Sequence, residues 1–189
     1  MNITGLNLKN PTILAAGIMG TTGASLIRMA REGAGAVVTK SIGPQPKDGH
    51  SNPSMLKLEC GYLNAMGLPN PSYEAFLPEL EKAKDKAGVP VIASIFGGDP
   101  EEFRMVAEGL ISGKPDAFEL NVSCPHAMGY GASVGTDPSM VKAVTSAVCE
   151  IADAPVWVKL TPNVTDIVTI GKAAQAGGAD AVVAINTVR

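Results

Sequence analysis

Short runs of consecutive apolar residues recur along the whole chain, and they predict buried β-strands. Strands with one face in water alternate apolar and polar residues, whereas these runs are nearly continuous. They therefore favour a parallel sheet that helices cover. The six predicted strands span residues 12–16, 36–40, 89–94, 117–121, 155–159 and 181–186.

Helical patterns separate several of these strands. Asp99 followed by Pro100 is typical of a helix start, because the Asp side chain caps free backbone N–H groups and proline suits the first turn. Asp137 and Pro138 repeat this signal. A third helix is predicted from residue 167 to glycines 177 and 178, where the chain can turn in a left-handed conformation. The alternation predicts an α/β fold, and by itself it fits both an open flavodoxin-like sheet and a (β/α) barrel.

Polar residues end most of the predicted strands. In a barrel these ends gather on one face, where active sites are built. A single lysine there could simply reach solvent, but two lysines close to buried strands favour a shared site for an anionic or planar ligand. The polar residues at equivalent positions are Lys40, Ser41, Ser94, Asn121, Lys159, Asn186 and Thr187.

Loops that follow the predicted strands carry further candidate chemistry. Residues 64–70 have an amide side chain at each end, and without further context this segment predicts an ordinary turn. Cys124 lies beside a hydroxyl and an imidazole directly after a strand, which favours a base or nucleophile over an inert buried thiol. The glycine-rich residues 127–135 predict either a mobile lid or a long connection. We expect Lys159 to contact a cofactor.

Composition limits the class of protein. The 189 residues are 46% hydrophobic and 17% charged, which suits one core and not two ordinary domains. A net charge of −3 with scattered basic residues argues against nucleic acid, and no apolar run has membrane-spanning length. Three cysteines without metal-ligand spacing predict neither a disulfide framework nor a metal site. Without a signal-like amino terminus, we expect a cytoplasmic protein.

Six motifs in order along the chain resemble the class 1 dihydroorotate dehydrogenases, most of all the NAD-linked class 1B type. Each motif is weak alone, whereas six in order are specific, and the resemblance covers the whole chain. It implies a (β/α)8 TIM barrel and a single domain over residues 1–189. The motifs are NPTILAAG at 10–17, TKS at 39–41, NAMGL at 64–68, NVSCP at 121–125, KLTPN at 159–163 and INT at 185–187.

The resemblance also implies roles for individual residues. Cys124 would remove the C5 proton of dihydroorotate while hydride leaves C6 for N5 of FMN, and Lys159 would stabilise the anionic reduced flavin. The implied substrate-binding residues are Lys40, Asn64, Ala65, Met66, Gly67, Leu68, Asn121, Asn186 and Thr187. The implied FMN-binding residues are Ala16, Lys40, Ser41, Ser94, Asn121, Lys159 and Ile185.

Three features depart from the family pattern. Ala16 stands where serine is common, so a contact there would be through the backbone. His126 replaces a common asparagine and matches the related dihydropyrimidine dehydrogenase, which leaves reduction of uracil or thymine as an alternative. The chain ends at Arg189, whereas a complete barrel has about 250 residues. We therefore expect a barrel truncated after about the sixth strand, inactive or unstable alone, or a non-catalytic barrel fragment.

The resemblance implies partners beyond the pyrimidine substrate. Class 1B members work with an electron-transfer subunit that carries FAD and an iron–sulfur cluster. A homo-oligomer is expected when the protein is full length.

Overall fold

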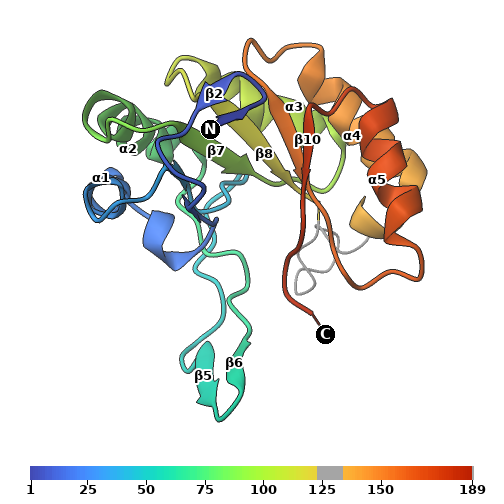
Figure 1. The fold of residues 1–189 in the computed structure, drawn as a ribbon. Coiled ribbons are helices and arrows are strands. Elements are labelled where there is room, and N and C mark those ends of the chain that lie inside the picture. The colour runs from blue at the N-terminus through green and yellow to red at the C-terminus, as the bar shows by residue number, and fades with distance from the viewer. Residues whose placement is uncertain (123–133, 189) are drawn as a thin grey trace.

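The protein folds into one curled parallel sheet with helices along its outer side (Figure 1). The computed structural model describes residues 1–122 and 134–188. The main sheet contains β3 (Ile13–Leu14), β4 (Ala36–Val38), β7 (Val91–Ile95), β8 (Ala117–Asn121), β9 (Val156–Lys159) and β10 (Ala181–Val183). These are the six apolar runs of the sequence, although only β8 has its predicted bounds and the other five strands are shorter than predicted.

The strands of this sheet lie in the same order as in the chain, and every neighbouring pair is parallel. A flavodoxin-like sheet would instead place its first strand between later strands. Sequential order with curling is the arrangement of a (β/α) barrel wall. The structure therefore confirms the predicted barrel architecture over six strands and rules out the open-sheet alternative.

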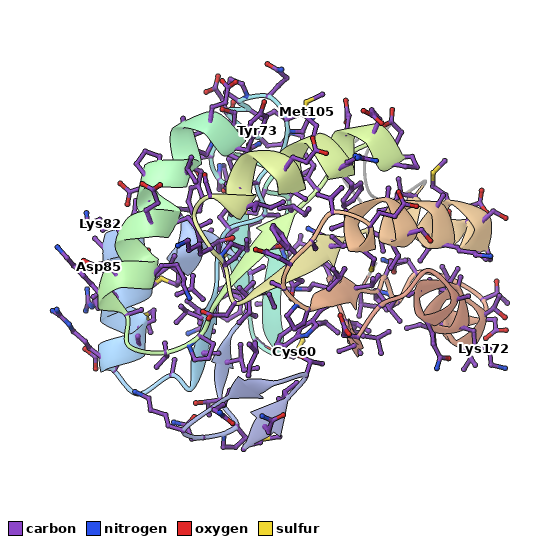
Figure 2. All side chains as sticks on the ribbon, turned by 90° about the horizontal axis from the view of Figure 1, so that it is seen from above. Cys60, Tyr73, Lys82, Asp85, Met105 and Lys172 are labelled. Atoms are coloured by element: carbon purple, nitrogen blue, oxygen red, sulfur yellow. The ribbon has the colours of Figure 1, made fainter. Side chains whose placement is uncertain are left out.

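In the described residues, five α-helices connect successive strands of the main sheet and form an arc around its outside (Figure 2). The predicted caps are confirmed, because Asp99 and Asp137 each accept a hydrogen bond from a backbone N–H of the first turn, and Asp166 caps α5 in the same way. The second helix was not predicted, since it contains Pro78, a residue that usually breaks helices. The helices are α1 (Gly23–Arg31), α2 (Tyr73–Lys86), α3 (Pro100–Ile111), α4 (Pro138–Cys149) and α5 (Ile167–Ala176).

Both faces of the sheet are apolar over much of their area, because successive side chains of a strand point to opposite faces. Outward-facing residues such as Val91 and Phe118 pack against the helices in the main core. Inward-facing Ile92, Ala117 and Trp157 form a second, smaller cluster. Burial on both faces explains why the strands appear as continuous apolar runs.

Two short hairpins, neither of them predicted, lie at opposite ends of the sheet (Figure 1). In the first, β1 (Asn2–Ile3) pairs with β2 (Leu6–Asn7), and its apolar side chains pack against the inner cluster. Trp157 Nε1 donates a 2.9 Å hydrogen bond to Thr4 Oγ1 of this hairpin. In the second, β5 (Met55–Leu58) pairs with β6 (Gly61–Asn64) and projects away from the body of the protein.

The helices in the described part of the chain are all too short or too polar to cross a membrane.

Replacing Phe118 by alanine tests the main core. Phe118 is fully buried between the sheet and the helices, so Phe118→Ala should lower the free energy of unfolding by about 3–5 kcal/mol. Urea unfolding measures this loss. Met105 lies on the outer side of α3 (Figure 2), and Met105→Ala should change the free energy of unfolding by less than about 0.5 kcal/mol. Equal effects of the two variants would contradict this assignment of the core.

Candidate active site

The inner face of the sheet changes from apolar to polar toward the carboxyl ends of the strands. Residues two positions apart on a strand share a face, so the apolar level is followed directly by a polar level. Ile92, Ala117 and Trp157 belong to the apolar level. Two positions further along the same strands stand the buried residues Ser94, Glu119 and Lys159.

A cavity of about 220 Å³ opens at this polar end of the sheet. Segments that are far apart in the sequence meet there: the ends of β4, β8 and β9, the loops after β3 and β6, and the chain after β10. The lining residues are Ala16, Gly17, Ile18, Lys40, Ser41, Asn64, Met66, Gly67, Leu68, Asn121, Lys159, Asn186 and Thr187. The carboxyl face of a barrel is where active sites are built, so this cavity is the candidate site.

Most residues that the sequence indicated as a site lie around this cavity. Of the expected substrate-binding residues, only Ala65 is not part of the lining; it is exposed. Of the expected cofactor-binding residues, Ser94 lies beneath the cavity behind Ser41, and Ile185 is 43% exposed outside it. Cys124 lies outside the residues that the structure describes, as does His126.

Two cationic side chains line the cavity. Lys40 follows β4 and Lys159 ends β9, and each is only 8% exposed. Two buried positive charges at one cavity create a potential that favours an anionic ligand. Across residues 1–122 and 134–188, no group of three or more His, Cys, Asp or Glu side chains is placed to hold a metal ion.

Hydrogen bonds between side chains join the strands at this level. Asn186 Nδ2 donates to Asn121 Oδ1 over 3.1 Å, and Asn121 Nδ2 donates to Ser41 Oγ over 3.0 Å. The hydroxyl oxygens of Ser41 and Ser94 are 2.9 Å apart, and Ser94 Oγ donates to Glu119 Oε1 over 3.2 Å. Such a network orients the polar groups that face the cavity.

Asn70 holds the loop that follows β6. Its Oδ1 accepts hydrogen bonds from the backbone N–H groups of Gly43 and Ser72 at 3.1 and 3.0 Å, and its Nδ2 donates to the Leu68 carbonyl. Leu68 and Gly67 take left-handed conformations, with φ of 55° and 74°. The segment that alone suggested an ordinary turn is therefore a braced loop that forms one wall of the cavity.

Glu119 is the candidate that sequence reasoning missed. It lies on β8 directly below the cavity and is only 2% exposed. Burial raises the pKa of its carboxyl group, while the charge of Lys159 and the hydrogen bond from Ser94 act in the opposite direction. An acidic residue inside a continuous apolar run was the available signal, because a buried charge needs compensating partners.

Comparison with known proteins gives a consistent result over the full length of the chain. The sequence pattern that defines dihydroorotate dehydrogenase matches residues 1–189. Two curated relatives carry the name dihydroorotate dehydrogenase B (NAD(+)), catalytic subunit. The one from Methanosarcina acetivorans is 74% identical over 189 residues, and the one from Pyrococcus abyssi is 54% identical over 189 residues. Each match covers 100% of this chain but only 61% and 62% of those relatives.

Solved structures give the same architecture at much lower identity. Ligand-free DHODH from Eimeria tenella matches with a TM-score of 0.87 at 21% identity, covering 100% of this chain and 61% of that one. The complex of the same enzyme with ferulenol matches with a TM-score of 0.86 at 20% identity, covering 99% and 59%. Identity this low supports the shared barrel fold and nothing more specific.

The raised pKa of Glu119 predicts a pH dependence of stability. A carboxyl group whose native pKa exceeds its unfolded value contributes stability below the unfolded value, about 4.3, and this is lost as the pH rises through the native pKa. Glu119→Gln stays neutral, so its free energy of unfolding relative to wild type should rise with pH. The gain is about 1.4 kcal/mol for each unit by which the native pKa is raised.

Urea unfolding between pH 4 and pH 9 measures this difference. Glu81 on α2 is exposed, so Glu81→Gln serves as the control and should parallel the wild type. A Glu119→Gln profile that also parallels the wild type would show that burial of this carboxylate has no net cost.

Proposed function

Because the chain belongs to the dihydroorotate dehydrogenase family, we propose that the protein oxidises dihydroorotate to orotate in pyrimidine biosynthesis, with FMN as its cofactor. The observation that carries this proposal is the polar cavity at the carboxyl ends of the strands, lined by two buried lysines and by asparagine side chains. The chain spans about 60% of the length of its curated relatives. The activity is therefore proposed for the whole protein that contains these residues.

The donor set of the cavity fits a flavin. The pyrimidine edge of the isoalloxazine ring offers carbonyl oxygens and one ring N–H, which amide and hydroxyl groups such as those of Asn121 and Ser41 can bind. Lys159 would bring positive charge to this edge, where reduction places negative charge. When bound, FMN would supply the two-electron acceptor that the oxidation requires.

The substrate adds a carboxylate and a second pyrimidine edge. Lys40 would pair with the carboxylate, because a charge-assisted hydrogen bond is the strongest recognition available at this cavity. The amides of Asn64, Asn121 and Asn186 would bind the ring carbonyl and N–H groups. Cys124, as a thiolate, would accept the C5 proton and become a thiol, which is the general-base half of the reaction.

The relatives' names also support a proposal about partners. They are called catalytic subunits of an NAD(+)-dependent enzyme, which supports an electron-transfer subunit with FAD and an iron–sulfur cluster as the partner of this protein. Such a subunit would connect the buried site to NAD(+).

Replacing Cys124 by serine tests the base. A serine hydroxyl is a much weaker acid than a thiol, so Cys124→Ser should slow reduction of bound FMN by dihydroorotate about 10²–10⁴-fold near neutral pH. Stopped-flow absorbance of the flavin measures this rate. The matched control is Cys60→Ser, because Cys60 is exposed between β5 and β6 and its loss should leave the rate unchanged. Full activity of Cys124→Ser would remove Cys124 from the mechanism.

Replacing Lys40 by glutamine tests recognition of the carboxylate. Losing a hydrogen bond to a charged group costs about 1.5–3 kcal/mol, so Lys40→Gln should weaken orotate binding by about 10- to 100-fold. Isothermal titration measures the dissociation constant. Lys172 points into solvent from α5 (Figure 2), and Lys172→Gln should bind orotate as wild type does.

Uracil separates the two candidate reactions, because it lacks the carboxylate. If the protein oxidises dihydroorotate, Lys40→Gln should weaken orotate binding without changing the weak binding of uracil. Turnover with uracil or thymine that exceeds turnover with dihydroorotate would instead establish the pyrimidine-reducing alternative.

A further inference from the structure

The hydrogen bonds beneath the cavity form one continuous chain that ends at Glu119. They connect Asn186 on the segment after β10, Asn121 on β8, Ser41 after β4 and Ser94 on β7. All the links except the first join buried side chains. Each serine hydroxyl has a single proton to donate, so an ionised acceptor at the end of the chain fixes the direction of both serine-donated bonds, and a protonated one releases it.

An ionised Glu119 allows only one direction. A carboxylate accepts hydrogen bonds and donates none, so Ser94 must give its proton to Glu119 Oε1. Ser94 then has no proton left for Ser41, and the 2.9 Å bond between the two hydroxyls must be donated by Ser41. Ser41 also accepts from Asn121 Nδ2. The Ser41 hydroxyl can therefore only accept one further hydrogen bond from a group in the cavity.

A protonated Glu119 allows the opposite direction. The acid can donate to Ser94, Ser94 can donate to Ser41, and the Ser41 hydroxyl proton is then available to the cavity that Ser41 lines. One proton taken from water at Glu119 thus changes the group offered at Ser41, two hydrogen bonds away, from an acceptor to a donor.

We propose that Glu119 is a positioning residue whose protonation state sets the direction of this hydrogen-bond chain and thereby the polarity of Ser41 toward the bound ligand. When Glu119 is a carboxylate, the Ser41 hydroxyl can accept a hydrogen bond from a ring N–H of the ligand. When Glu119 is protonated, the Ser41 hydroxyl can donate a hydrogen bond to a carbonyl oxygen or to a ring nitrogen that carries no hydrogen. The ligand class is a planar heterocycle that presents such an edge, and this part of the inference rests on the proposed function.

The groups around Glu119 act on its pKa in opposite directions. Desolvation favours the protonated acid, whereas Lys159 on β9 favours the carboxylate. Lys40 after β4 is the second cation at the cavity, while β7 contributes the uncharged Ser94. An anionic ligand near Lys159 would offset the positive charge that favours ionisation, so binding of an anion should promote protonation of Glu119.

Infrared titration of the ligand-free protein tests the chain directly. The carbonyl band of the protonated Glu119 side chain is identified by its absence in Glu119→Gln. Ser94→Ala removes the hydrogen bond that favours the carboxylate, so the Glu119 band should persist to higher pH in that variant. An unchanged titration midpoint in Ser94→Ala would overturn the proposal. If Glu119→Gln does not fold, isotope-labelled glutamate assigns the band to a glutamate, and its shift in Ser94→Ala assigns it to the neighbour of Ser94.

FMN binding, followed by quenching of flavin fluorescence, tests the effect on the ligand. Across the pH range in which Glu119 titrates, the dissociation constant of the wild type should change by about two- to tenfold, the value of one hydrogen bond. Glu119→Gln should not show this change. The phosphate of FMN titrates near pH 6, about the same in every variant. The test is therefore the difference in pH dependence between the wild type and Glu119→Gln.

Thr145→Val is the matched control for loss of a buried polar group. Thr145 is fully buried on α4 and donates a 2.7 Å hydrogen bond to the Val141 carbonyl, away from the cavity. This variant should keep the pH dependence of the wild type. If wild type and Glu119→Gln bind FMN with the same pH dependence, the inference fails and the proposed function stands. If neither the full-length protein nor any of its variants binds FMN, the proposed function fails, and the infrared titration still decides the role of Glu119.

Discussion

Alternation of side chains along parallel strands that are covered on both faces is the constraint on which the rest of the structure depends. One set of side chains packs against the helices, and the other set points to the inside of the curled sheet. Because neighbouring strands are in parallel register, residues at the same level of different strands meet. On the inner face of β7, β8 and β9 an apolar residue is therefore followed two positions later by a polar one, and the polar residues at the carboxyl ends lie close together.

Placing that polar level inside the protein has an energetic cost that the structure offsets with mutual hydrogen bonds. Ser41, Ser94 and Asn121 satisfy one another, and Ser94 also bonds to Glu119. Every buried side-chain nitrogen and oxygen in the described ranges has a hydrogen-bond partner. The result is a polar level in which hydrogen bonds between side chains orient the groups beneath the cavity.

Much of the candidate site could be predicted from the sequence, because polar residues are unusual next to buried strands and here they stand at equivalent positions, at the carboxyl ends of several strands. Lys40, Asn121 and Lys159 were recognisable in this way, and they do line one cavity. Glu119 was not recognised, since a single acidic residue within an apolar run has no visible partner in the sequence. Ser94 was recognised as polar, but its place behind Ser41 depends on the packing of neighbouring strands.

The sequence by itself determined the six strands, the capped starts of α3 and α4 and the α/β fold class, because apolar runs and Asp-based caps are local signals. It did not determine the order of the strands, the two hairpins or the bracing of the 64–70 loop by Asn70. Only the tertiary structure decided these, because register between strands and the convergence of loops depend on contacts between residues far apart in the chain. The hydrogen bond between Ser94 and Glu119 and the influence of the Lys159 charge on Glu119 are contacts of the same kind.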